Sequence, residues 1–260
     1  MQTKNAKYIL KLTVYISLII QAVTGLFNIS LLSLDSYDKS FNDDAEILLQ
    51  LIWLGVIVQV IEGTFYIWLA KSIDTVMNIT MYRYYDWFFS TPTMLITFVV
   101  YLLYLKEKKE EDVESEKIQT TTVNKKIEAV RKNVKKSNNN LWDYMKNNQY
   151  TLSIVLFLNA IMLIFGYLGE IGVLHNGTAV IAGFIPFVAY FYLIYDQYAK
   201  HTDFGKILFW LFGGIWSLYG FAALAPYYIK NISYNILDIF SKNFFEIFIG
   251  VKLLSVYNYK

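Results

Sequence analysis

Seven continuously apolar stretches run through this 260-residue chain, at residues 8–32, 46–70, 82–105, 150–170, 178–199, 205–229 and 233–257. Each is about long enough for the ~20 helical residues that cross a bilayer. The strands of a membrane barrel would instead alternate apolar and polar residues over about ten positions. The sequence therefore predicts an all-α membrane protein, a bundle of seven transmembrane helices that forms one domain over residues 1–260.

The composition suits lipid as a solvent, since 56% of the residues are hydrophobic and 17% are charged. The first stretch is too long for a secretory signal and lacks its small-residue cleavage pattern, so we expect a retained span. There are no cysteines, and His175 and His201 are too few for an ordinary zinc site, so no metal is expected. A net charge of +2 is too small to indicate a nucleic-acid partner, which leaves the lipid bilayer.

One long charged loop is expected between the third and fourth helices, at residues 106–149. It carries 11 of the 23 Lys and Arg residues and 8 of the 21 Asp and Glu residues. Residues 106–117 are acidic and poor in apolar side chains, which favours disorder. In residues 123–136, apolar side chains recur at helical spacing among lysines, so this part is either a basic helix on an anionic membrane surface or a solvated charge run. The apolar positions are Val123, Ile127, Val130 and Val134.

The distribution of Lys and Arg predicts the orientation, because cytoplasmic loops carry an excess of them. We leave out Arg83 and Lys242, which fall inside predicted spans. With the N-terminus outside, the cytoplasmic segments hold 16 of these residues and the outer segments hold 5. We therefore expect a multi-pass integral membrane protein with an extracellular N-terminus and a cytoplasmic C-terminus.

Ionisable side chains inside the spans are costly, and they mark functional positions. In the seventh stretch, Asp238 and Lys242 are four residues apart and share one helix face. The third stretch brings Arg83 and Asp86 together in the same way. A plain buried ion pair would explain Lys242 only if its geometry were excellent, so we expect these residues to form a functional site.

The segments that carry these residues resemble microbial (type-1) rhodopsins. RYYDWFFSTPTML at 83–95 is similar to the third helix of that family, LDIFSKN at 237–243 to the seventh, and WSLYG at 216–220 to the sixth. The resemblance implies that retinal is bound covalently to Lys242 as a protonated Schiff base. It also implies that Asp86 and Asp238 are the counterions, that Arg83 balances the surplus negative charge, and that light isomerises retinal from all-trans to 13-cis.

The same resemblance implies a retinal pocket. Trp87 and Trp216 are expected as flat walls on either side of the polyene, with the Tyr219 hydroxyl near the counterions. Ser90 and Thr91 are expected to hydrogen-bond the Asp86 carboxylate or to pack on the polyene. One position departs from the family pattern: the proline that follows the tyrosine is Gly220 here.

Two observations bear on transport. Thr97 stands eleven residues after Asp86, where outward proton pumps of the family often carry a carboxylic proton donor. Polar residues at helical spacing also line the first two spans, and another follows the lysine. These are Ser17, Gln21, Gln59, Glu62 and Asn243. A serine, a glutamate and an asparagine in these helices resemble the central constriction of channelrhodopsins and of similar viral rhodopsins.

We therefore expect a light-gated ion channel that conducts monovalent cations or protons, and no enzyme. A light-driven outward proton pump is the first alternative. A sensory photoreceptor that signals through a partner at the long loop is the second. A homo-oligomer also stays open, because no motif of small residues spaced four apart indicates a particular helix interface.

Overall fold

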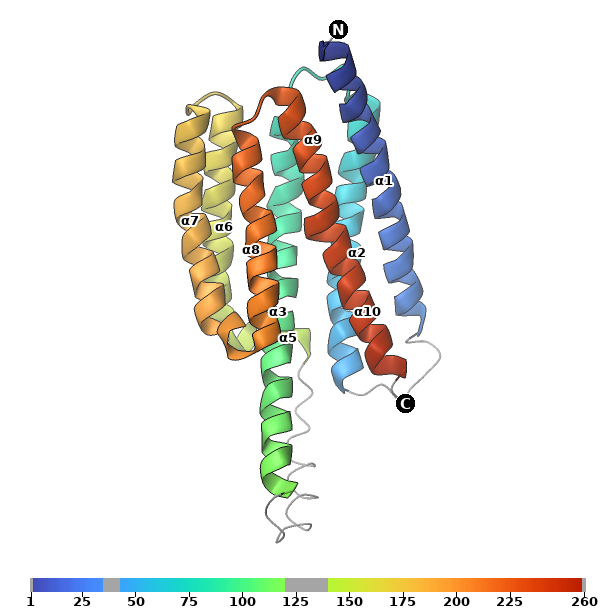
Figure 1. The fold of residues 1–260 in the computed structure, drawn as a ribbon, viewed down its shortest axis with the longest axis vertical. Coiled ribbons are helices and arrows are strands. Elements are labelled where there is room, and N and C mark those ends of the chain that lie inside the picture. The colour runs from blue at the N-terminus through green and yellow to red at the C-terminus, as the bar shows by residue number, and fades with distance from the viewer. Residues whose placement is uncertain (1, 35–42, 120–139, 259–260) are drawn as a thin grey trace.

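The computed structural model describes residues 2–34, 43–119 and 140–258, and all regular structure in them is helical. The chain folds into a bundle of seven helical segments (Figure 1), so the predicted fold class is confirmed. The segments are α1 (Gln2–Leu34), α2 (Asp43–Ser72), α3 (Thr80–Gln119), α6 (Gln149–Glu170), α7 (Asn176–Gln197), α8 (Asp203–Ala223) and a composite seventh segment made of α9 (Tyr227–Asp238), the π-helical turn η2 (Ile239–Asn243) and α10 (Phe244–Asn258).

The bundle has the polarity of a membrane protein. Six of its helices are long and apolar enough to cross a membrane, and the seventh segment is divided by η2. Large apolar side chains face outward on the helices, as Ile181, Ile185 and Trp210 do, each about 70% exposed. Charged and polar side chains such as Arg83 and Asp238 are fully buried. This arrangement is expected where lipid surrounds the helices, and the chain is an integral multi-pass membrane protein.

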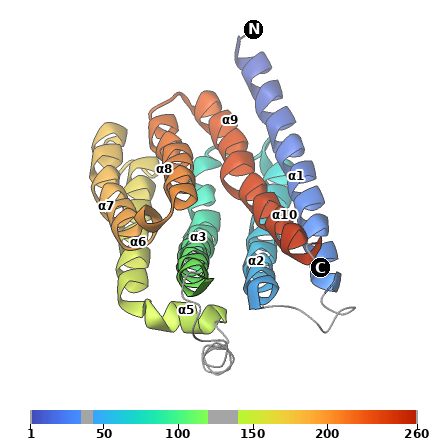
Figure 2. The ribbon, with the colours of Figure 1, turned by 60° about the horizontal axis from the view of Figure 1, so that its bottom comes forward.

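The first and seventh segments lie side by side and run in the same direction. α1 packs against α2, α9 and α10, while α6 and α7 pair on the opposite side of the bundle (Figures 1 and 2). α1 and α9 both begin at the end of the bundle that holds the N-terminus. Residues at matching depth on α1 and the seventh segment therefore come together along the full height of the bundle.

The prediction of disorder at residues 106–117 is wrong, because α3 continues as a helix to Gln119 and projects beyond the bundle (Figure 1). Lysine and glutamate are strong helix formers, and a helix already nucleated in the membrane needs little more to continue. Lys108 adds ion pairs to Glu111 at 3.1 Å and to Asp44 at 2.6 Å. The 123–136 segment lies outside the described residues. Near its end, the loop forms α5 (Leu141–Asn147), capped by the Asn140 side chain.

The boundary between the sixth and seventh segments also differs from the predicted one. The apolar stretch expected over 205–229 ends as a helix at Ala223, and α9 already begins at Tyr227. Pro226 is the residue between them that decides this, because proline cannot donate the backbone hydrogen bond that would continue α8. It stands instead at the N-cap of α9, where no donor is needed.

Candidate functional site

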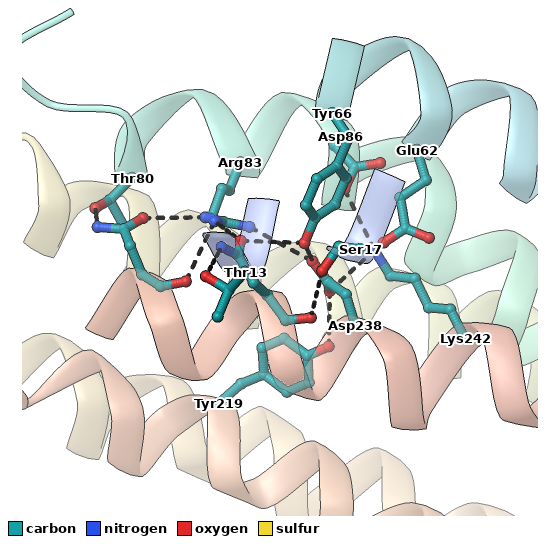
Figure 3. A network of polar contacts seen from close by, with 12 residues as sticks. Thr13, Ser17, Glu62, Tyr66, Thr80, Arg83, Asp86, Tyr219, Asp238 and Lys242 are labelled. Atoms are coloured by element: carbon teal, nitrogen blue, oxygen red, sulfur yellow. Dashed lines mark hydrogen bonds and ion pairs between the residues drawn. The ribbon is translucent and has the colours of Figure 1, made fainter. Parts of the chain in front are cut away.

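Lys242 lies in the π-helical turn η2, in the middle of the seventh segment, with its side chain buried. Such turns are rare and are found frequently at functional sites. The Lys242 Nζ atom lies 2.7 Å from Glu62 Oε1, 3.2 Å from Asp238 Oδ1 and 3.3 Å from Asp86 Oδ2 (Figure 3). One amine is therefore surrounded by three carboxylates from α2, α3 and α9.

The contact of Glu62 with Lys242 is a feature that the sequence did not reveal. The sequence predicts Glu62 in an ion path and only Asp86 and Asp238 beside the amine. Glu62 and Lys242 are 180 residues apart in sequence, so no local spacing connects them. Removing charges from water is costly unless partners of opposite sign compensate them. The three carboxylates outnumber the two cations Lys242 and Arg83, so the centre of the bundle holds one more acidic than basic group.

Arg83 belongs to the Asp238 side of this centre. Its guanidinium donates to Asp238 Oδ2 at 3.4 Å and to Asn231 Oδ1 at 3.1 Å, and it also contacts Asn235. The Tyr66 hydroxyl donates to the same Asp238 oxygen at 2.8 Å. The two asparagines were not predicted, although asparagines four residues apart on α9 are a signal that sequence reasoning could have used.

The Asp86 carboxylate has fewer hydrogen-bond partners than that of Asp238. Its Oδ2 faces Lys242, while its Oδ1 has no hydrogen-bond partner among the described residues. The expectation that Ser90 or Thr91 bonds this carboxylate is not met. The Thr91 hydroxyl donates to the Trp87 carbonyl at 2.8 Å, one helical turn back, and accepts from Asn159 Nδ2 at 2.9 Å. Ser90 Oγ is buried without a partner among the described residues, and the Thr91 hydroxyl bonds the backbone of its own helix instead of Asp86.

A mostly apolar cavity lies beside the lysine. Its lining joins α3, α6, α7, α8 and the seventh segment and includes Trp87, Thr91, Trp216, Tyr219 and Lys242, whereas Ser90 does not line it. The Tyr219 hydroxyl donates to Asp238 Oδ1 at 2.8 Å and contacts Ser241 Oγ at 2.8 Å. The cavity thus has aromatic walls and contains a lysine amine that is paired with carboxylates, the groups that imine formation with an apolar aldehyde needs.

The predicted ion-path residues do not form one connected cluster. The Ser17 hydroxyl donates to the Asn235 carbonyl at 3.1 Å, while Asn243 Nδ2 donates to Gln59 Oε1 at 3.2 Å. Among the described residues, no direct hydrogen bond joins Ser17, Glu62 and Asn243 to one another. Gln21 is buried, and neither of its amide atoms has a partner. The Thr97 hydroxyl donates to the Thr93 carbonyl within α3, and among the described residues no hydrogen bond joins Thr97 to this group.

Residues 15–255 match the family described as bacteriorhodopsin-like protein, over most of the chain. The chain belongs to the bacteriorhodopsin-like family. Members of this family bind retinal through a Schiff-base lysine. In this bacteriorhodopsin-like chain, Lys242 is the lysine that lines the apolar cavity.

Solved structures of rhodopsins share the fold of this bacteriorhodopsin-like chain. A viral rhodopsin, OLPVRII, is 21% identical with a TM-score of 0.70, over 95% of this chain and 98% of that one. A blue light-absorbing proteorhodopsin from Med12 is 15% identical with a TM-score of 0.66, over 96% and 98%. The proton-pumping rhodopsin AR2 of the marine alga Acetabularia acetabulum is 15% identical with a TM-score of 0.64, over 96% of both chains. No curated protein matches in sequence.

Gly220, where this chain departs from the family's proline, has a packing reason. A Cβ atom at this position would lie 2.5 Å from the ring of Phe184 on α7, which also lines the cavity. We expect Gly220→Ala to lower the stability of the retinal-loaded protein by about 1–3 kcal/mol, because the ring must shift in a packed wall. Thermal bleaching in detergent measures this effect. Gly214→Ala is the matched control on the same helix, since nothing lies within 4 Å of its added Cβ; equal bleaching of both variants would contradict the prediction.

Proposed function

We propose that this protein binds retinal covalently at Lys242 and acts as a light-gated channel for monovalent cations or protons. Retinal, when bound, supplies the absorption of visible light and the isomerisation that starts the response. The observation that most supports this proposal is a column of buried polar side chains. The column lies between α1, α2 and the seventh segment and passes directly beside Lys242. We also propose that the end of the bundle holding the C-terminus faces the cytoplasm, as the charge count predicts.

The column is built from matching positions on the two parallel segments. On α1 the polar residues recur every three or four positions, and so they do on the seventh segment. The α1 residues are Thr13, Ser17, Gln21, Thr24 and Asn28, and those of the seventh segment are Asn231, Asn235, Asp238, Lys242 and Glu246. All but the half-buried Thr13 are buried. α2 closes the third side with Gln59, Glu62 and Tyr66.

The column contains more polar atoms than the protein itself satisfies. Both amide atoms of Gln21, the Nε2 of Gln59 and the Oδ1 of Asn243 are buried without a hydrogen-bond partner among the described residues. Buried polar groups in proteins are almost always paired, with water where protein partners are missing. Polar side chains that only join two helices would hydrogen-bond to each other, and each such bond would stabilise the bundle by about 1 kcal/mol or less. The unpaired groups instead support a hydrated path for ions.

The position of Glu62 connects this path to the site that light changes. Its Oε1 atom accepts from Lys242 Nζ, while its Oε2 atom has no hydrogen-bond partner in the part of the chain that the structure describes. Any movement of the Lys242 amine away from Glu62 breaks a contact that closes the column at mid-height. Such a two-state contact between side chains is a means of gating.

Voltage-clamp recording during light pulses tests the proposed function. We expect a photocurrent that reverses sign with voltage and whose reversal potential moves with external sodium or potassium. A current that stays outward at every voltage would refute the channel. It would favour the proton pump, the alternative supported by the 3.3 Å contact of Asp86 with Lys242 and by the proton-pumping structural relative. A pump should acidify an unbuffered medium in light, and a protonophore should abolish this signal.

Glu62→Gln tests the place of Glu62 in the path. We expect the variant to stay coloured but to carry a changed ion selectivity or a current several-fold different from the wild-type one, because the side chain that loses its charge lies at the narrow contact with Lys242. Glu170→Gln is the matched control, since the Glu170 side chain is only 7% exposed and its carboxylate pairs with Lys230 at 2.7 Å rather than with Lys242. Identical currents in the Glu62 variant and the control would remove Glu62 from the path.

A further inference from the structure

Glu246 is a buried carboxyl that the proposed retinal site does not use. It lies on α10 four residues after Lys242, and none of its side chain is exposed to solvent. Among the described residues, no cation lies within ion-pair distance of it. The Asn28 amide on α1 is near enough to interact, yet neither Glu246 oxygen has a hydrogen bond of normal geometry. Burying an acidic group with so few partners is costly, so its position needs an explanation.

The space that the carboxyl occupies belongs to α2. Gly55 faces Glu246 there, and a Cβ atom added to Gly55 would overlap the carboxyl group, whose Oε1 atom would lie 3.0 Å away. The carboxyl therefore packs directly against the α2 backbone at Gly55, in the space that a side chain would fill if residue 55 were not glycine. Because the carboxyl is the end of a flexible side chain, it can leave this place without a movement of either helix.

Glu246 also marks the end of the polar column. Beyond it, toward the end of the bundle that holds the C-terminus, each of the three segments continues with fully or nearly fully buried apolar residues in one packed cluster. These are Leu31 on α1, Leu48 and Leu51 on α2, and Ile249 and Leu253 on α10. An apolar constriction blocks ions by excluding water. The Glu246 carboxyl is thus the last polar group of the column before this layer of apolar side chains.

We propose that Glu246, packed on Gly55, is a second gate of the ion path: it closes the column at the C-terminal end of the bundle and binds the passing cation when it moves off Gly55. This inference rests on the proposed channel function. The gate lies one helical turn from Lys242 along the same segment, so a shift of the π-helical turn η2 moves both.

A double-mutant cycle under voltage clamp tests the gate, with the full-length protein carrying retinal. Gly55→Ala displaces the carboxyl, and Glu246→Ala removes it. We expect each variant to slow channel closure after a light pulse roughly fivefold or more, the factor that corresponds to about 1 kcal/mol of lost closed-state stability. Because both act on one contact, the double variant should close no more slowly than Glu246→Ala alone. Gly214→Ala, on α8 outside the column and with none of the described atoms within 4 Å of its added Cβ, should behave as wild type.

Glu246→Gln keeps the size of the side chain and removes its charge. We expect it to shift the reversal potential in a sodium gradient and to abolish the carboxyl or carboxylate band of Glu246 in the light-induced infrared difference spectrum. Wild-type closure in Gly55→Ala, effects that multiply in the double variant, or no infrared band that depends on Glu246 would each overturn the gate. A wild-type protein that is coloured but passes no current would refute the channel itself, so the two failures are distinguishable.

Discussion

Purified Lys242→Arg protein supplied with retinal is expected to remain colourless in visible light. A guanidinium does not form the imine, but it keeps a positive charge among Glu62, Asp86 and Asp238, so the bundle should still fold. Lys242→Ala should also be colourless. It should in addition be less stable by about 3–5 kcal/mol, the usual effect of leaving buried charges without their partner. Absorption spectra and the thermal unfolding of both variants measure the two effects separately.

The matched control for this prediction is Lys252→Arg. Lys252 is a second lysine of the seventh segment, on α10, where it lies over the rings of Phe204 and Phe248. It has no contact with the carboxylates around Lys242 among the described residues, and its variant should take up retinal and colour as the wild type does. A coloured Lys242→Arg protein would mean that retinal is attached elsewhere, and the proposed site would be wrong.

Neutralising a carboxylate beside Lys242 is expected to move the absorption maximum to longer wavelength. The ground state of the bound chromophore carries its positive charge near the Lys242 nitrogen, whereas the excited state spreads that charge away. A nearby anion therefore stabilises the ground state more. We expect the shift for Asp86→Asn and for Glu62→Gln. The Glu62 variant should shift further, because attraction falls with distance and the 2.7 Å contact is roughly 1.2-fold stronger than the 3.3 Å one at equal dielectric.

Glu170→Gln serves again as the control, because the carboxylate of Glu170 pairs with Lys230 and not with Lys242. Its spectrum should equal that of the wild type. Absorption spectra of the four purified proteins at one pH are sufficient. A wild-type spectrum for Asp86→Asn, together with no spectral change on acid titration, would leave Asp238 and Glu62 as the counterions and remove Asp86 from that role.

Local spacing was enough to predict the spans and the contact between Asp238 and Lys242. Runs of about twenty apolar residues have one stable outcome in lipid, since a helix satisfies its own backbone hydrogen bonds. Asp238 and Lys242 stand one turn apart, and their contact at 3.2 Å follows from that spacing. The expectation failed at residues 106–117, where composition suggested disorder. There, the continuation of an existing helix and the ion pairs of Lys108 decided the outcome.

Contacts between segments far apart in the chain were decided by the tertiary structure alone. Sequence spacing places Glu62 on a face of α2, but only the packing of α2 against the seventh segment brings it to Lys242. The same holds for Asn159 beside Thr91 and for Glu246 on Gly55. Side-chain periodicity determines which face of a helix is polar. Which two polar faces meet, and at what depth, depends on how seven helices share the interior of one bundle.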